Sequence, residues 1–187
     1  MKIPTRPTSG ALALVACVLA IAAGPAARQD ATVDPWDRVR VLVGEWEGAA
    51  EGQAGSGVSR RTYAFVLGGR FLHEKNVSTY PAQEKNKTGE VHEHWSIISY
   101  DRARRVLVLR QFHQEGFVNQ YVLDTARSTP EKLVFDSERF ENLADSWRAR
   151  ETYDIRSADE FVETFEVAAP GEALEVYSRT RFTRVKR

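Results

Sequence analysis

Residues 44–52, GEWEGAAEG, alternate between two kinds of side chain and begin a pattern that continues almost to the C-terminus. Trp46, Gly48 and Ala50 fall on one face of an extended chain, and Glu45 and Glu47 fall on the other. A period of two residues is typical of β-strands with one buried face. The chain from residue 44 onward is therefore predicted to be all-β.

Short turns divide this region into predicted strands. Their ranges are 44–52, 59–67, 70–80, 90–100, 105–114, 117–124, 132–140, 146–155, 161–168 and 173–184. Connections this short force neighbouring strands to pair antiparallel. A sheet of about ten such strands hides its apolar face and its edges by closing on itself. We expect an up-and-down antiparallel barrel over residues 44–187, with a sandwich as the alternative.

A short helix is predicted just before the first strand. Asp34 can cap the first free N–H groups, and Pro35 suits the first helical position because it needs no hydrogen-bond donor there. The pattern predicts a helix over residues 35–42, within a connecting segment 28–43.

Residues 1–27 resemble a secretory signal peptide, since a basic start precedes an apolar run that ends in small residues. The run from Ala11 to Ala23 is shorter than the roughly 20 residues of a membrane span, and no later stretch approaches that length. We expect a periplasmic or secreted protein without a membrane span. Lipid anchoring through Cys17 is disfavoured, because apolar residues follow this cysteine where a lipoprotein turns polar.

Composition excludes several function classes. Cys17 is the sole cysteine, so the exported part offers no disulfide and no thiolate metal ligand. The 26 basic and 26 acidic residues balance, which disfavours a nucleic-acid partner. Fingerprints of serine hydrolases, phosphate-binding loops and dinucleotide-binding enzymes are missing from the sequence.

Three of the four histidines occupy strand positions that bring them together. His92 and His94 share one face of a predicted strand. Pairing Tyr100 with Arg105 across the next turn sets His113 opposite His92, so the three imidazoles form one patch. Neutral imidazoles on neighbouring strands are typical of zinc and iron sites. One interpretation is therefore a metal site on His92, His94 and His113.

The other interpretation is a polar barrel lining, or a solvent-exposed face, in which each histidine is hydrogen-bonded. Whether the three histidines form a cluster depends on how the two strands are paired, because a shift of one residue moves His113 to the opposite face. In the register considered, Gln111 lies opposite His94, and neither Glu93 nor Glu115 shares the histidine face.

The motif Gly44-Glu45-Trp46-Glu47-Gly48 resembles the Gly-x-Trp opening of calycin barrels, which include lipocalins and fatty-acid-binding proteins. Its fuller Gly-x-Trp-x-Gly form is similar to nitrobindin-type haem-binding barrels and to a family of exported bacterial proteins of unknown function. The similarity to that last family runs through much of residues 36–184. It implies a barrel with a small-molecule ligand. Calycins also stack a last-strand arginine on this tryptophan, which implies Arg179 or Arg181 here.

The resemblance to nitrobindin also raises haem as a cofactor. Nitrobindin-like proteins hold the haem iron through a histidine late in the chain, and residues 114–187 contain no histidine. Haem is therefore less expected than zinc or iron.

The expected function is the binding of an apolar or amphipathic small molecule without catalysis, with Trp46, Arg179 and Arg181 as ligand contacts. The alternatives are a metal-dependent enzyme using His92, His94 and His113, a haem-binding barrel, and a fully packed interaction protein.

Overall fold

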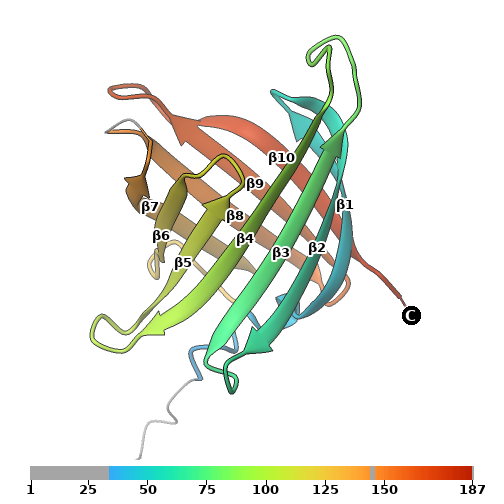
Figure 1. Ribbon diagram of the computed structural model, residues 1–187. Helices are drawn as coiled ribbons and strands as arrows, with labels where there is room; N and C mark the ends of the chain where they lie inside the picture. The colour runs from blue at the N-terminus through green and yellow to red at the C-terminus, as the bar shows by residue number, and fades with distance from the viewer. Residues whose placement is uncertain (1–33, 144–145, 187) are drawn as a thin grey trace, which may run out of the picture. The chain divides into compact units, whose positions relative to one another are not determined.

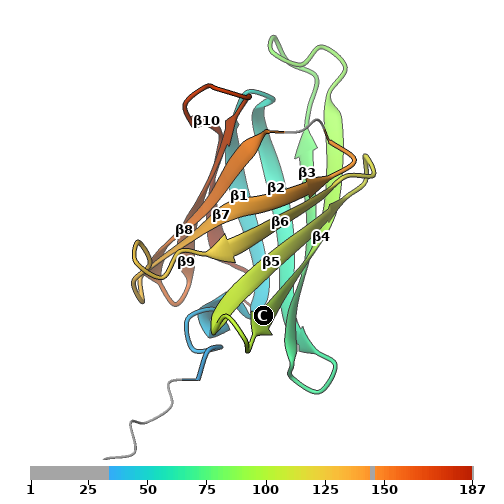
Figure 2. The ribbon, with the colours of Figure 1, turned by 90° about the vertical axis from the view of Figure 1, so that its left-hand side faces the viewer.

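A computed structural model describes residues 34–143 and 146–186, and these form a closed antiparallel barrel (Figures 1 and 2). Its ten strands are β1 (Gly44–Gly52), β2 (Gly55–Val66), β3 (Phe71–Tyr80), β4 (Glu90–Asp101), β5 (Val106–His113), β6 (Val118–Leu123), β7 (Lys132–Glu141), β8 (Arg148–Ser157), β9 (Glu160–Ala168) and β10 (Glu175–Arg184). Each strand pairs with its sequence neighbours, and β1 pairs with β10 to close the barrel. The all-β prediction is confirmed. The predicted leader lies outside the described residues.

The helix expected over residues 35–42 is reduced to a turn followed by η1 (Arg40–Leu42), a 3-10 helix. Asp34 does cap the segment, since its Oδ1 accepts a hydrogen bond of 3.0 Å from the N–H of Trp36. Most backbone bonds then reach back three residues, as from Leu42 to Val39 at 3.0 Å. Three residues per turn align Val39 with Leu42, and both side chains are buried in the core. Packing against the barrel therefore selects the tighter helix.

The connections between strands alternate between the two ends of the barrel, as Figure 1 shows. The β1–β2, β3–β4, β5–β6, β7–β8 and β9–β10 connections lie at one end, which we call the loop end. The other connections lie at the opposite end with η1, which we call the η1 end. The two ends differ in their interior side chains, and this difference positions the candidate site.

The interior near the η1 end is apolar and is organised around Trp46. The indole is 1% exposed, and its N–H donates to the carbonyl of Leu42 at 2.7 Å. Phe161 packs edge-on against it at 4.7 Å between ring centroids, and Phe182 stacks on Phe161. Gly48 keeps this packing possible, because a Cβ there would lie 2.6 Å from the Thr180 methyl group. Trp46 is therefore a core residue of the closing strand pair.

The cation stacked on Trp46 is Arg184, rather than Arg179 or Arg181. Its guanidinium carbon lies 4.2 Å from the indole centroid, and the β1–β10 register pairs Arg184 directly with Trp46. Even-numbered residues of β10, such as Phe182, therefore point inward. Arg179 and Arg181 do share a face, but it is the outer face, where Arg181 forms an ion pair with Glu160 at 2.8 Å. The sequence did contain a signal for this orientation. Arg184 lies two residues from the apolar Phe182 and so shares its face, whereas Arg179 and Arg181 lie an odd number of residues from Phe182.

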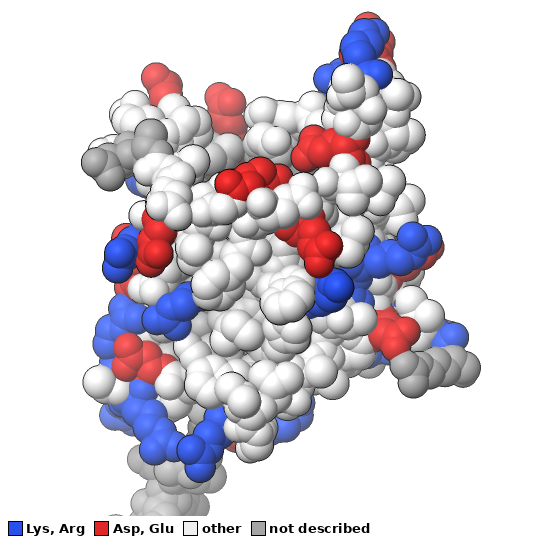
Figure 3. All heavy atoms as spheres, viewed as in Figure 1, with Lys and Arg blue, Asp and Glu red and all other residues white. Residues whose placement is uncertain are grey.

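The outer wall carries scattered charges of both signs and a broad uncharged area over β3 and β4 (Figure 3). Trp95 and Phe112 pair across β4 and β5 on this outer face and are 51% and 46% exposed. His73 packs edge-on against Trp95 at 5.5 Å between ring centroids. The fourth histidine thus lies outside the barrel, away from the other three. Among the described residues, no helix has the length and apolar character needed to cross a membrane.

Candidate functional site

A cavity of about 430 Å³ occupies the half of the barrel nearer the loop end. The lining at the loop end includes Glu90 and Glu115 together with apolar residues from the connections and strand ends, namely Phe117, Phe140, Leu143 and Trp147. The deeper lining of the cavity is polar and comes from inward positions of the strands, where an all-apolar core would place aliphatic side chains. The barrel therefore combines an apolar interior near η1 with a polar chamber that opens at the other end.

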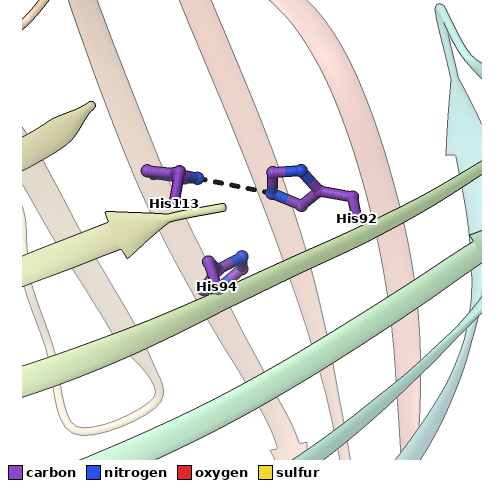
Figure 4. A group of neighbouring side chains, drawn as sticks. All are labelled: His92, His94 and His113. Atoms are coloured by element: carbon purple, nitrogen blue, oxygen red, sulfur yellow. Dashed lines mark hydrogen bonds between the residues drawn. The ribbon is translucent and has the colours of Figure 1, made fainter. Parts of the chain in front are cut away.

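His92 and His94 on β4 and His113 at the end of β5 meet on the wall of this cavity (Figure 4). One ring nitrogen from each lies within 4.8 Å of the other two, and the ring centroids are 5.3–5.6 Å apart. The closest pair is His113 Nδ1 and His92 Nε2, at 3.3 Å. The three histidines that the sequence places on one face are therefore neighbours in the structure.

The register that brings the histidines together differs from the expected one by two residues. His113 pairs with His94, and Gln111 pairs with Ser96. The turn begins later than expected because Asp101 still belongs to β4 and its Oδ1 accepts hydrogen bonds from the next N–H groups of the loop, Ala103 and Arg104. A shift of two residues preserves the face of every side chain, so the cluster survives it.

Each of the three histidines has a polar partner on its remaining ring nitrogen. Glu115 Oε1 lies 2.9 Å from His92 Nδ1, and Glu74 Oε1 lies 3.3 Å from His94 Nε2. Asn119 Nδ2 lies 3.2 Å from His113 Nε2. The sequence-based expectation that Glu115 stays away from the histidines was wrong. Glu115 lies in a turn, where strand alternation no longer fixes the direction of a side chain.

The cluster favours the neutral form of His113. Burial, reinforced by the neighbouring His94 and His92, lowers the pKa of His113 to about 3. A neutral ring keeps a lone pair on one nitrogen, which can accept a hydrogen bond or bind a metal.

A buried ion cluster lies next to the histidines. Arg61 on β2 contacts Glu163 on β9 through two hydrogen bonds of 2.5 and 2.7 Å and contacts Glu74 on β3 at 3.1 Å. Burial acts to raise the pKa of Glu74, but Arg61 and then His94 outweigh it and lower that pKa to about 2. Arg61 also stacks on Phe182 at 4.5 Å, so the cluster borders the apolar interior. Sequence reasoning missed it, because contacts across the barrel leave no local spacing.

Glu151 on β8 is a buried carboxyl group without a cationic partner of its own. Burial, and then the negative charge of Glu163, raise the pKa of Glu151 well above its usual value. Gln111 Nε2 donates to Oε1 at 3.3 Å, and Oε2 is buried without a hydrogen-bond partner. The raised pKa favours the protonated form of Glu151, which lines the cavity.

We expect the Glu151→Gln variant to lose part of the pH dependence of folding stability. The raised pKa of Glu151 means that the folded protein holds a proton which the unfolded chain releases above about pH 4.5. The wild-type free energy of unfolding should fall as pH rises from 5 to 8, by up to about 1.4 kcal/mol per pH unit from this group. Urea unfolding at several pH values, with the exposed Glu84→Gln as control, measures the difference. Parallel curves for wild type and Glu151→Gln would contradict the assignment.

The other predicted ligand contacts do not reach the cavity. Trp46 is packed in the apolar interior and is not among the cavity-lining residues. Arg179 and Arg181 point outward, and Arg179 donates to Thr164 at 3.4 Å. The predicted metal ligands His92, His94 and His113 all line the cavity.

Comparison with known proteins gives a likeness at the level of fold. Neither a protein-family model nor a curated protein sequence matches the chain. Among solved structures, 16 chains are similar to this one. One is the crystal structure of Rv2717c from M. tuberculosis, with a TM-score of 0.59 and 14% identity over 81% of this chain and 98% of that chain. At this level of identity, the match shows that the two chains share a barrel fold.

Proposed function

We propose that the protein is an exported binding protein that holds an amphipathic small molecule in its cavity and does not catalyse a reaction. The observation that carries the proposal is the mixed lining of the cavity, in which apolar side chains such as Phe117 and Phe140 accompany polar ones such as Gln111 and Asn119. Barrels of this kind usually hold one ligand in such a mouth. Export rests on the signal-like residues 1–27. The resemblance to calycin barrels also supports ligand binding.

Two buried polar atoms in the cavity wall support a polar head group on the ligand. Glu151 Oε2 and Asn119 Oδ1 have no hydrogen-bond partner, although both residues line the cavity. Buried polar atoms are normally paired, since an unpaired one is costly. A ligand that both donates and accepts hydrogen bonds would satisfy the amide oxygen and the protonated carboxyl together.

The charge of the lining disfavours an anionic ligand. Among the described lining residues, Arg61 is the only lysine or arginine, and Glu163 and Glu74 already hold its guanidinium. Four glutamates line the same cavity; Glu163 is paired with Arg61 and the raised pKa of Glu151 favours its neutral form, but Glu90 and Glu115 have no lysine or arginine beside them in the lining. A carboxylate head would meet these groups without a free cation to pair with. The ligand head is therefore neutral or cationic.

Displacement of the neutral dye Nile red by three amphiphiles of equal chain length tests this proposal. Dodecanol and dodecylamine should displace the dye at least about tenfold more effectively than laurate, because only laurate brings a negative charge into the cavity. Leu143→Asp at the mouth should weaken dye binding, whereas Leu67→Asp at the η1 end serves as the matched control. Displacement by laurate at the lowest concentration, or equal effects of the two variants, would refute the proposal.

A further inference from the structure

We propose that His92, His94 and His113 bind one divalent first-row transition-metal ion of the zinc class, with an open coordination position facing the cavity. The inference goes beyond the binding of an amphiphile and stands without it.

The spacing of the ring nitrogens fits such an ion. Zinc–nitrogen bonds of about 2.0–2.1 Å in tetrahedral geometry place two ligand nitrogens roughly 3.3 Å apart. His92 Nε2 and His113 Nδ1 are 3.3 Å apart. The ligand atom of His94 lies within 4.8 Å of both. Three nitrogens thus converge from two paired strands.

The partners on the remaining ring nitrogens separate this cluster from a chance meeting of histidines. Metal-binding histidines nearly always donate their other N–H to a carboxylate, carbonyl or water, which fixes the ring and the tautomer. Glu115 holds His92 through Nδ1, and Glu74 holds His94 through Nε2. These contacts leave His92 Nε2 for the ion. His94 Nδ1 lies 3.5 Å from Asn76 Nδ2, so the ion takes the place of this hydrogen bond.

His113 needs a change of tautomer, and Asn119 can support it. In the structure, Asn119 Nδ2 faces His113 Nε2, so the ring proton lies on Nδ1, toward His92. When the ion binds Nδ1, that proton moves to Nε2 of the same ring, and no proton is gained or lost. Asn119 Oδ1, which is buried without a partner, accepts it once the amide has rotated.

The local charge also favours a cation. Glu115 and Glu74 each lie one hydrogen bond away from a ligand ring. With three protein ligands on one wall of the cavity, the remaining coordination position faces the chamber and is filled by water or by a donor atom of a bound molecule.

Metal titration of protein purified without a histidine tag and stripped with EDTA tests the inference. We expect one Zn²⁺ or Co²⁺ per chain, and visible absorption typical of tetrahedral Co²⁺. His92→Ala and His113→Ala should weaken binding at least about 100-fold, and Glu115→Gln about tenfold. His73→Ala is the matched control, since this histidine lies on the outer wall and should leave affinity unchanged.

Three outcomes would overturn the inference: no binding by folded wild type, affinity that survives both His92→Ala and His113→Ala, or a loss for His73→Ala equal to theirs. Thermal unfolding checks that each variant is folded. If one histidine variant does not fold, the other and Glu115→Gln still decide the question. Metal titrations contain no amphiphile and dye displacement contains EDTA, so the two proposals fail separately.

Discussion

Replacing Arg61 with methionine is expected to lower the free energy of unfolding by about 3–5 kcal/mol, which is the usual cost of breaking a buried ion pair from one side. Arg61 is 6% exposed and forms ion pairs with both Glu163 and Glu74, which are 5% and 1% exposed. Without the guanidinium, both carboxylates are buried with no cation to compensate them. Urea denaturation at pH 7, followed by far-ultraviolet circular dichroism, measures the loss.

A compensating variant separates charge from packing. Adding Glu163→Gln to Arg61→Met removes one of the two uncompensated charges, so the double variant should regain part of the lost stability. Arg60→Met is the matched control, because its side chain is exposed and its ion pair with Glu47 contributes little. A loss below about 1 kcal/mol for Arg61→Met, or a further loss in the double variant, would contradict this account of the cluster.

Trp46→Ala is expected to destabilise the protein by about 3–5 kcal/mol, as truncation of a buried aromatic residue in a core normally does. The substitution removes the edge-on contact with Phe161, the hydrogen bond to the Leu42 carbonyl and the surface on which Arg184 stacks. Thermal and urea unfolding would measure the change.

The same residue tests whether core and cavity act independently. Trp46→Phe should keep much of the packing and should leave Nile red affinity unchanged, because Trp46 does not line the cavity. A clear loss of dye binding in folded Trp46→Phe would show that the indole contacts the ligand, as the sequence-based hypothesis held.

The strands could be predicted from the sequence because their signals are local. In β1, the alternation of Trp46 and Gly48 with Glu45 and Glu47 identifies both the strand and its inward face. The type of helix that precedes β1 could not be predicted in the same way. Capping by Asp34 is a local signal, but the choice of a 3-10 helix depends on packing of Leu42 against the barrel.

The candidate site was only partly predictable, for two physical reasons. A register that differs from the predicted one by two residues keeps the histidines on the same face. The cluster was therefore predicted correctly, although the exact pairing of residues was wrong. The contact of Arg61 with Glu163 joins residues 102 positions apart, and many charged residues compete as partners at such separations. Whether Arg184 or Arg181 faces Trp46 depends on the closing register of β1 and β10, which no single turn determines.

The position of the Arg61 cluster bears on how this barrel can change over evolution. Arg61 rests on Phe182 on one side and lines the cavity on the other, so it marks the boundary between the dry interior and the open chamber. Substitutions on the chamber side leave the aromatic packing around Trp46 intact. New ligand preferences can therefore arise from changes among chamber residues outside the Arg61 cluster, while this cluster and the aromatic core sustain the fold.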